Sequence, residues 1–289
     1  MFEQLGLIGC GLMGGSFALA LKKAGLVKRV VGYSKSPTTT ERARQMGVID
    51  VEAPSALMAV SGADIVLLAV PVSATEASFK AIKHLITPSM LIMDVGSTKR
   101  DVVDASRRVL KEQAGVFVAT HPITGKEVSG VEHADADLYY GKQVIITPTE
   151  RTQVVQLQKA TDLWTALGCQ VLKMSPESHD AAYAAVSHLP HLIAFALMNA
   201  INEQPNGRDY LSLAGPGFRD FTRIAASDAH MWRDVFMANR QELLAQSKLF
   251  QKAMMQLEQM ISRDENEALE AEIDKASLTR AQWRMTTRK

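Results

Sequence analysis

The sequence predicts an α/β protein, in which a doubly wound, mostly parallel Rossmann-type sheet is followed by an all-helical C-terminal part. Three observations predict this. Apolar strand-like segments alternate with helical segments up to residue 174, a glycine-rich turn follows the first of these segments, and no strand pattern recurs from Ser175 onward. We therefore predict two domains, residues 1–174 and residues 175–289.

The first predicted strand, residues 5–8, runs into glycines with the spacing Gly-x-Gly-x-x-Gly. In this pattern the first glycine permits a tight turn, the second lets backbone approach a pyrophosphate, and the third lets the next helix pack closely on the sheet. The helix expected from Met13 to Ala24 would direct unpaired N–H groups at the phosphates. The pattern predicts a dinucleotide site made by Gly9, Gly11, Leu12, Met13 and Gly14.

The second predicted strand, residues 29–33, ends where such folds discriminate between cofactors. An acidic residue there binds a free ribose 2′-hydroxyl, but this chain has Ser34, Lys35 and Ser36. One cation and two hydroxyls suit a 2′-phosphate, so the sequence predicts NADP in preference to NAD. The alternative is a solvated loop that is indifferent to the 2′ position.

Several further strands are expected to end at one edge of the sheet. We predict strands over residues 64–71, 90–95, 116–120, 144–147 and 170–172. Ligands bind outside the carboxyl ends of parallel strands, where Val70 with Pro71, Ser97 and His121 are expected beside the glycine turn. His121 is therefore a candidate catalytic residue, although a histidine after a buried strand can also be purely structural. The long connection over residues 126–142 is typical of a lid.

The helical part begins at Ser175-Pro176, which gives an N-cap serine and a proline at the first helical position. Pro190 is expected to kink this helix. Ser187 and His191 are four residues apart and share one face, so both can contact the same ligand. The alternative is a buried polar pair that stabilises a helix crossing.

Two arginines follow in a second helical segment. Arg219 and Arg223 lie on one face if residues 216–224 are helical, and a guanidinium suits bidentate binding of a carboxylate. A solvated, salt-bridged face is the alternative. A long helix is then predicted from about residue 229 to 261, whose length favours packing against a partner chain, and a charged, exposed helix from Arg263.

Composition excludes other classes. With 32 basic and 31 acidic residues among 289, the net charge of +1 offers no field that recruits nucleic acid or an anionic membrane. The longest strongly apolar run, residues 65–72, is far below the roughly 20 residues that span a bilayer. The first strand begins almost at once, so we expect no signal peptide and a cytoplasmic location. Cys10 and Cys169 are expected to be reduced thiols, and no cluster has metal-ligand spacing.

Taken together, several motifs give the chain a close resemblance to the prephenate/arogenate (cyclohexadienyl) dehydrogenase family of tyrosine biosynthesis. They are the glycine turn, Gly96-Ser97-Thr98-Lys99, His121-Pro122-Ile123-Thr124-Gly125, Ser187-His188-Leu189-Pro190-His191, the segment 218–225 and the segment 227–232. The resemblance implies nicotinamide-dependent oxidative decarboxylation of prephenate or arogenate to an aromatic product. It also implies a homodimer formed through the helical domain.

The resemblance assigns roles to single residues. It implies that His121 is the catalytic histidine, which as a neutral base accepts the ring hydroxyl proton, and that Ser97 is its hydrogen-bonding partner. It places Arg223 as the carboxylate-binding residue. The substrate pocket would further hold Ser187, His188, His191 and Lys126. Lys126 stands where many relatives have threonine, so the choice between prephenate and arogenate stays open.

Two rival interpretations are weighed against this one. Another two-domain NADP-dependent hydroxy-acid dehydrogenase would need a catalytic lysine on a glycine-rich helix of the second domain, and the sequence offers no such helix. A non-catalytic NADP-sensing protein would keep the glycine turn but has no reason to combine Ser97, His121, His191 and Arg223.

Overall fold

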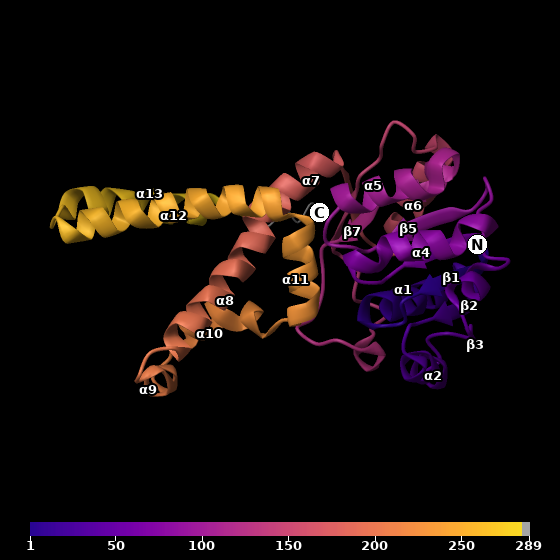
Figure 1. Ribbon diagram of the computed structural model, residues 1–289, viewed down its shortest axis with the longest axis horizontal. Helices are drawn as coiled ribbons and strands as arrows, with labels where there is room; N and C mark the ends of the chain where they lie inside the picture. Colours follow the sequence, from indigo (N-terminus) through magenta and orange to yellow (C-terminus); the bar gives the residue numbers. More distant parts are fainter. Residues whose placement is uncertain (285–289) are drawn as a thin grey trace. The chain divides into compact units, whose positions relative to one another are not determined.

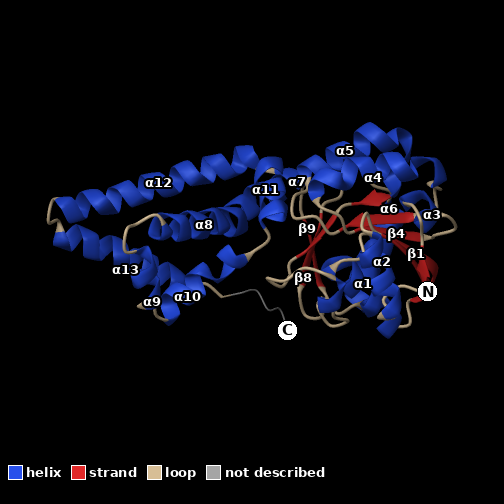
Figure 2. Ribbon diagram, turned by 60° about the horizontal axis from the view of Figure 1, so that its bottom comes forward, coloured by secondary structure: helices blue, strands red, loops and turns tan. Residues whose placement is uncertain are grey.

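The computed structural model describes residues 1–284, and the chain divides into two compact units, residues 1–240 and a unit that begins at Gln241. We describe each unit by itself. The first contains all of the strands and the helices up to α11, and the second contains the helices α12 and α13 (Figures 1 and 2). The domain boundary that we predict at residue 174 lies within the first unit and stays a prediction.

The main sheet has six parallel strands in the order β3-β2-β1-β4-β5-β6. These strands are β1 (Phe2–Ile8), β2 (Val27–Tyr33), β3 (Val51–Glu52), β4 (Ile65–Leu68), β5 (Leu91–Asp94) and β6 (Phe117–Val118). β1 pairs with both β2 and β4, so the strand order reverses between β1 and β4. This confirms the predicted doubly wound fold and puts the ligand-binding crevice of such sheets at the glycine turn after β1.

Helices cover both faces of this sheet, as Figure 2 shows. They are α1 (Leu12–Lys23), α2 (Pro37–Gln45), α3 (Ala56–Val60), α4 (Thr75–Ile82), α5 (Arg100–Leu110) and α6 (Val154–Ala166). Alternate strand residues point to opposite faces, so Leu5 and Leu7 of β1 join a core with Phe17 of α1 and Trp164 of α6. A second core packs α3, α4 and α5 against the other face.

The structure contains a second, smaller sheet, and one strand that we predict for the main sheet is divided between the two. We expected a strand over residues 116–120 followed by His121, but the chain leaves the main sheet at Ala119, and His121 lies inside β7 (Thr120–Pro122). The Asp94 carboxylate accepts the Thr120 N–H at 2.9 Å, and the Thr120 hydroxyl donates to the Asp94 carbonyl, which diverts the chain there. β7 pairs antiparallel with β8 (Gln143–Ile146), and β8 pairs parallel with β9 (Gln170–Lys173).

The helix that begins at Ser175 contains a π-helical turn. α7 (Pro176–Tyr183) continues through the five-residue π turn η5 (Ala184–His188) into α8 (Leu189–Asn202). The N–H of Leu189 donates to the Ala184 carbonyl five residues back. The next residue, Pro190, has no N–H to donate, and its ring displaces the preceding turn. The helix therefore widens into a π turn just before this proline, which we expected to kink the helix.

Three more helices and a short 3₁₀ turn complete the first unit. They are α9 (Gly207–Ser212), α10 (Pro216–Thr222), the 3₁₀ turn η6 (Arg223–Ala226) and α11 (Ala229–Ala238). Arg219 therefore lies in α10, whereas Arg223 opens the 3₁₀ turn that follows it.

The single helix predicted over residues 229–261 is wrong, because the chain breaks it at Asn239. Asn239 has φ −108° and ψ 28°, outside the helical range, and it separates α11 from α12 (Arg240–Ser262). Its side chain is buried and donates to the Asp180 carbonyl at 2.7 Å, a bond that the break allows. The expected exposed helix beyond Arg263 is present as α13 (Asn266–Gln282).

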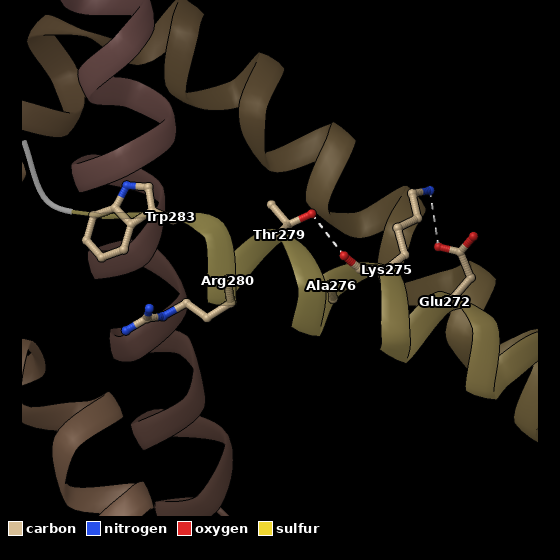
Figure 3. A pocket seen from close by; sticks show the side chains of 6 residues that line it. All are labelled: Glu272, Lys275, Ala276, Thr279, Arg280 and Trp283. Atoms are coloured by element: carbon tan, nitrogen blue, oxygen red, sulfur yellow. Dashed lines mark hydrogen bonds and ion pairs between the residues drawn. The ribbon is translucent and has the colours of Figure 1, made fainter.

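The second unit also carries an open pocket on α13, shown in Figure 3. Its lining residues are Glu272, Lys275, Ala276, Thr279, Arg280 and Trp283. None of the site residues that we predict lines this pocket, so it does not belong to the expected dinucleotide or substrate site.

One helical stretch among the described residues, 176–202, is long and apolar enough to cross a bilayer, with a mean hydropathy of 1.4 over an 18-residue window. Length and composition alone are weak evidence. The stretch carries His179, Asp180 and two further histidines, which a bilayer would have to accommodate. The expected absence of a membrane segment stays a prediction.

Candidate active site

The glycine turn after β1 has the shape that a dinucleotide needs. Gly9 has φ +99°, and a Cβ there would lie 2.1 Å from the Ala69 carbonyl oxygen. A Cβ on Gly14 would lie 2.0 Å from the Gly9 carbonyl oxygen, so only glycine lets α1 approach this closely. In contrast, a Cβ on Gly11 would meet nothing within 4 Å. The open space lies where the pattern expects a pyrophosphate.

The N-terminus of α1 leaves N–H groups for an anion. The helix begins at Leu12, and its N-cap residue, Gly11, provides no side-chain cap. Val70 lies beside the turn, with its Cγ1 3.3 Å from where a Gly9 Cβ would be, and Pro71 follows it. These residues fit a bound dinucleotide, because the phosphates could lie in the space where Gly11 has no side chain.

The segment after β2 is joined to this turn. Ser34 Oγ accepts the N–H of Cys10 at 2.8 Å, which fixes that hydroxyl against the glycine turn. The hydroxyls of Ser36 and Thr38 lie 2.8 Å apart, and the side chain of Lys35 is exposed. The three predicted residues therefore lie at the edge of the candidate dinucleotide site, with Lys35 free to turn toward an anion.

The predicted catalytic residue, His121, is the first member of a buried hydrogen-bonded chain. Its Nδ1 lies 2.8 Å from Nε2 of His179, and Nδ1 of His179 lies 2.8 Å from Oδ1 of Asp180. His179 is 0% exposed and Asp180 1%. The ring of Tyr183 stacks on His179, with centroids 4.5 Å apart, and lies 5.0 Å from His121. Since His121 itself is partly exposed, its ring joins this interior chain to the surface of the site.

Asp180 is anchored on both sides. Its carboxylate accepts the N–H of Lys99 at 2.8 Å and that of Arg100 at 3.0 Å, so it caps the N-terminus of α5 from α7. Its main-chain carbonyl accepts the Asn239 side-chain amide. The start of α5 thus holds the carboxylate of Asp180, and Asn239 holds its backbone.

The loop that holds Ser97 is built around a second buried charge pair. Lys99 Nζ pairs with Asp94, whose carboxylate also accepts the N–H of Gly96 at 2.9 Å. Both charged side chains are almost fully buried. Among residues 1–284, no hydrogen bond joins Ser97 to His121. Nδ1 of His121 is bonded to Nε2 of His179. The implied role of Ser97 stays a prediction.

Electrostatics keep the two linked histidines neutral near pH 7. Burial lowers the pKa of His121 well below 6.5, and the nearby positive charge of Lys99 acts in the same direction. Burial also lowers the pKa of His179, although its bond to Asp180 acts in the opposite direction. Burial opposes ionisation of Asp180, but the hydrogen bonds from His179 and the α5 N–H groups leave the pKa of that carboxyl below its usual value. The chain therefore consists of two neutral rings on a carboxylate.

The predicted residues of the helical part form a separate group. His191 Nδ1 donates to the Ser187 carbonyl at 2.9 Å, and its ring stacks on Trp232 with centroids 3.5 Å apart. His188 is 1% exposed, and its Nδ1 accepts the Asn239 amide at 3.2 Å. The structure thus joins the His191 ring to the backbone of Ser187 and buries His188 against Asn239. The expected places of these three residues in the substrate pocket stay predictions.

Arg223 is linked to the segment that follows His121. Its guanidinium pairs with the carboxylate of Glu127, six residues beyond His121. Lys126, the neighbouring predicted residue, pairs instead with Asp135 at 3.3 Å within its own loop. The ion pair with Glu127 places the guanidinium over the loop that leads away from the candidate catalytic histidine.

Our sequence reasoning missed His179, Asp180, Tyr183 and Asn239. One signal was available, because His179, Tyr183, Ser187 and His191 follow one another at intervals of four residues, and such residues share a helix face. The role of Asn239 had no such signal, because its partners are distant in sequence.

Family models match both halves of the chain. The nucleotide-binding domain of prephenate dehydrogenase matches residues 17–173, and the dimerization domain of prephenate dehydrogenase matches residues 175–275. The crystal structure of prephenate dehydrogenase from Aquifex aeolicus in complex with hydroxyphenyl propionate and NAD⁺ superposes with a TM-score of 0.90 and 35% identity. The match covers 98% of each chain.

Two curated relatives agree. Prephenate dehydrogenase of Bacillus subtilis is 37% identical over 246 residues, which are 84% of this chain and 66% of that protein. Cyclohexadienyl dehydrogenase of Zymomonas mobilis is 33% identical over 246 residues, 84% of this chain and 83% of that protein. This chain thus spans about two thirds of the length of the Bacillus protein.

Proposed function

This chain belongs to the prephenate dehydrogenase family, and we propose that it catalyses the NAD(P)-dependent oxidative decarboxylation of prephenate, arogenate or both, giving 4-hydroxyphenylpyruvate or tyrosine. The observation that carries the proposal beyond the family is the state of His121. It is a partly exposed histidine with a lowered pKa, next to the carboxyl ends of β5 and β6. A general base for an alcohol oxidation must be neutral and must reach the substrate.

His121 would act on the ring hydroxyl of the substrate. As the O–H bond breaks, a ring nitrogen of His121 takes the proton, while the carbon that carries the oxygen loses a hydride. A nicotinamide held at the glycine turn supplies the hydride acceptor. Loss of the ring carboxylate as CO₂ then makes the ring aromatic, and His121 can return its proton to the oxygen. This sequence of proton steps needs one neutral base and no other acid.

Arg223 would bind a carboxylate of the substrate. Its guanidinium has the geometry for a bidentate contact, and its carboxylate partner Glu127 lies in a loop at the protein surface. A substrate carboxylate would exchange with that of Glu127. Ser187, His191 and Lys126 stay candidate pocket residues, and the side chain of Lys126 is the one whose charge can discriminate between a keto acid and an amino acid.

We further propose that NADP is preferred to NAD. Support comes from the absence of a carboxylate among residues 34–36 and from the exposed Lys35 at the edge of the site. The A. aeolicus relative was crystallised with NAD⁺, so NAD is the competing cofactor. The charge of Lys35 favours the extra phosphate.

The remaining proposals concern assembly and location. In α8 and α12 only Ala194 and Leu243 are buried, and apolar side chains such as Leu249 and Met255 are exposed, which supports a homodimer through the matched dimerization domain. Light scattering should give about twice 31.6 kDa, and a monomer would contradict this. Two free, buried cysteines fit the cytoplasm.

An absorbance assay at about 340 nm tests the activity. Prephenate, arogenate and a 3-hydroxy acid are offered in turn with NADP or NAD. We expect reduced cofactor with prephenate or arogenate and stoichiometric release of CO₂. Turnover of the 3-hydroxy acid alone, or of none of the three, would contradict the proposal.

A further inference from the structure

The chain Asp180–His179–His121 has a fixed direction of hydrogen bonding. An ionised carboxylate can only accept, so the 2.8 Å contact with Asp180 requires a proton on Nδ1 of His179. A neutral imidazole carries one proton, which leaves Nε2 of His179 as an acceptor. The 2.8 Å contact between the two rings then requires that Nδ1 of His121 donates.

We propose that His179 and Asp180 are positioning residues that hold neutral His121 with its proton on Nδ1, so that Nε2 carries the lone pair that takes the substrate proton. The inference rests on the base role of His121 proposed above. Nothing in that role requires a particular partner for Nδ1, and the implied partner, Ser97, makes no hydrogen bond to His121 among the described residues. The second histidine therefore adds a specific function to the site.

Asp180 is suited to set this direction because it cannot easily become a donor. Two N–H groups at the N-terminus of α5 donate to its oxygens, and a protonated carboxyl would have to give up one of these bonds. The Asn239 amide holds the backbone of the same residue. The bonds from α5 thus keep the carboxylate ionised and correctly turned. Capping α5 does not itself require a histidine beside Asp180.

His179 must stay neutral for the direction to hold. If it were charged, its Nε2 would donate, Nδ1 of His121 would accept, and the proton of His121 would sit on Nε2, where it blocks the substrate. Burial of the ring and the nearby charge of Lys99 oppose a proton on His179, while Asp180 favours one. Lys99, His188 and Tyr183 also lie close to His121. Three elements, α5, α7 and the π turn, thus surround the pair.

When His121 receives the proton, the direction does not change. A substrate O–H bond breaks, an N–H bond forms at Nε2, and the Nδ1–H of the resulting cation still donates to His179. Asp180 lies at the far end of this chain and favours the new positive charge. Orientation and charge stabilisation therefore come from the same two residues.

The first test reads proton positions without using activity. The full-length chain is labelled with ¹⁵N-histidine, and two-bond N–H correlations are recorded at pH 7 without cofactor, with His121→Asn and His179→Phe giving the assignments. We expect protonated Nδ1 and unprotonated Nε2 in both His121 and His179. A proton on Nε2 of His121 overturns the proposal.

The second test uses a matched pair of variants. His179→Phe keeps a ring but removes the acceptor, and it should lower kcat about 10- to 10³-fold with little change in KM or in dinucleotide affinity, because His121 is released to the wrong tautomer. His179→Gln can place an amide oxygen near the position of Nε2, so it should recover part of the loss. Unchanged kcat in His179→Phe overturns the proposal.

A control separates positioning from general weakening of α7. Ser175 caps this helix by accepting the Ser178 N–H at 3.1 Å, and among the described residues its hydroxyl makes no hydrogen bond to His121, His179 or Asp180. Ser175→Ala should lower the melting temperature by a few degrees and leave kcat within about twofold. If Ser175→Ala lowers kcat as much as His179→Phe does, the effect is structural and the proposal fails.

Failure of the proposed function would look different. If His121→Asn keeps full activity, His121 is not the base, and the proposed function of His121 fails. The proton positions on His121 and His179 can then still be as expected, but they have no effect on catalysis. If His121→Asn loses activity but Nε2 of His121 is protonated in the native chain, only the positioning proposal falls.

Discussion

The guanidinium of Arg223 pairs with the carboxylate of Glu127, six residues beyond His121 along the chain. Both side chains are partly exposed, at 59% and 43%, so the pair contributes little to stability. A carboxylate brought by the substrate can therefore replace Glu127 at low cost. The pair joins η6 of the helical segment to the loop after β7.

Replacing Arg223 should act on binding. Arg223→Gln should raise KM for prephenate or arogenate by roughly 10- to 150-fold, equivalent to about 1.5–3 kcal/mol for a lost charge-assisted contact, with a smaller effect on kcat. Arg219→Gln is the matched control, because Arg219 pairs only with the adjacent Asp220 among the described residues and both are exposed. Steady-state kinetics decide, and a normal KM in Arg223→Gln would remove the residue from the pocket.

Replacing His121 should act on the chemical step. His121→Asn should lower kcat about 10²- to 10⁴-fold, the usual range for general-base assistance, because asparagine has no basic nitrogen. Binding of the oxidised dinucleotide, followed by fluorescence titration, should be unchanged. Survival of kcat would show that another group takes the proton.

Local patterns were enough to predict the sheet and the glycine turn. The run of apolar residues predicted β4, although the strand ends at Leu68 and not at Pro71, and the glycine spacing predicted the tight turn at Gly9. The early end of β6 depends on Asp94, which binds Thr120 across 26 residues. No pattern around residue 119 carries that information.

The same distinction explains the site. The spacing of Ser187 and His191 predicts a shared face, and the His191 ring bonds to the Ser187 main-chain carbonyl, while their contact with one ligand stays a prediction. The hydrogen bond from His121 to His179 crosses 58 residues, and the chain that it begins ends at Asp180, which accepts N–H groups at the start of α5. Likewise, the helix break at Asn239 follows from bonds to Asp180 and His188. The periodicity of the sequence cannot predict such long-range side-chain hydrogen bonds.

Cofactor choice should depend on one exposed charge. If Lys35 binds a 2′-phosphate, Lys35→Ala should lower kcat/KM for NADP by roughly 10-fold or more and leave that for NAD within about twofold. The ratio of the two values in the unmodified enzyme should favour NADP. An enzyme that prefers NAD, or a variant that loses both cofactors equally, would contradict the prediction.

Two glycines of the turn should behave in opposite ways. Gly14→Ala should lower the free energy of unfolding by several kcal/mol, because its Cβ would meet the Gly9 carbonyl. Gly11→Ala should unfold like the native chain, since its Cβ meets nothing, but should bind the dinucleotide much more weakly. Thermal unfolding and titration with cofactor measure the two effects. Normal cofactor affinity in Gly11→Ala would move the pyrophosphate elsewhere.

Stability should fall as the pH is lowered from about 6.5. Burial lowers the pKa of His188 from 6.5 to about 4, with a smaller opposing effect from Asp180. The ring is neutral in the folded chain and takes up a proton on unfolding, so the unfolded state binds more protons below pH 6.5 and stability rises with pH there. At pH 5 the loss from this residue is about 2 kcal/mol relative to pH 7.

His188→Asn tests this contribution, because asparagine keeps an oxygen that can accept the Asn239 amide but does not titrate. Urea unfolding at pH 7, 6 and 5, at one fixed protein concentration, should show a difference between pH 7 and pH 5 that is smaller by about 2 kcal/mol in the variant. His121 and His179, whose pKa values are also lowered, should leave a remaining slope of the same sign. An identical pH dependence in the variant and the native chain would mean that His188 is already able to take up its proton in the folded protein.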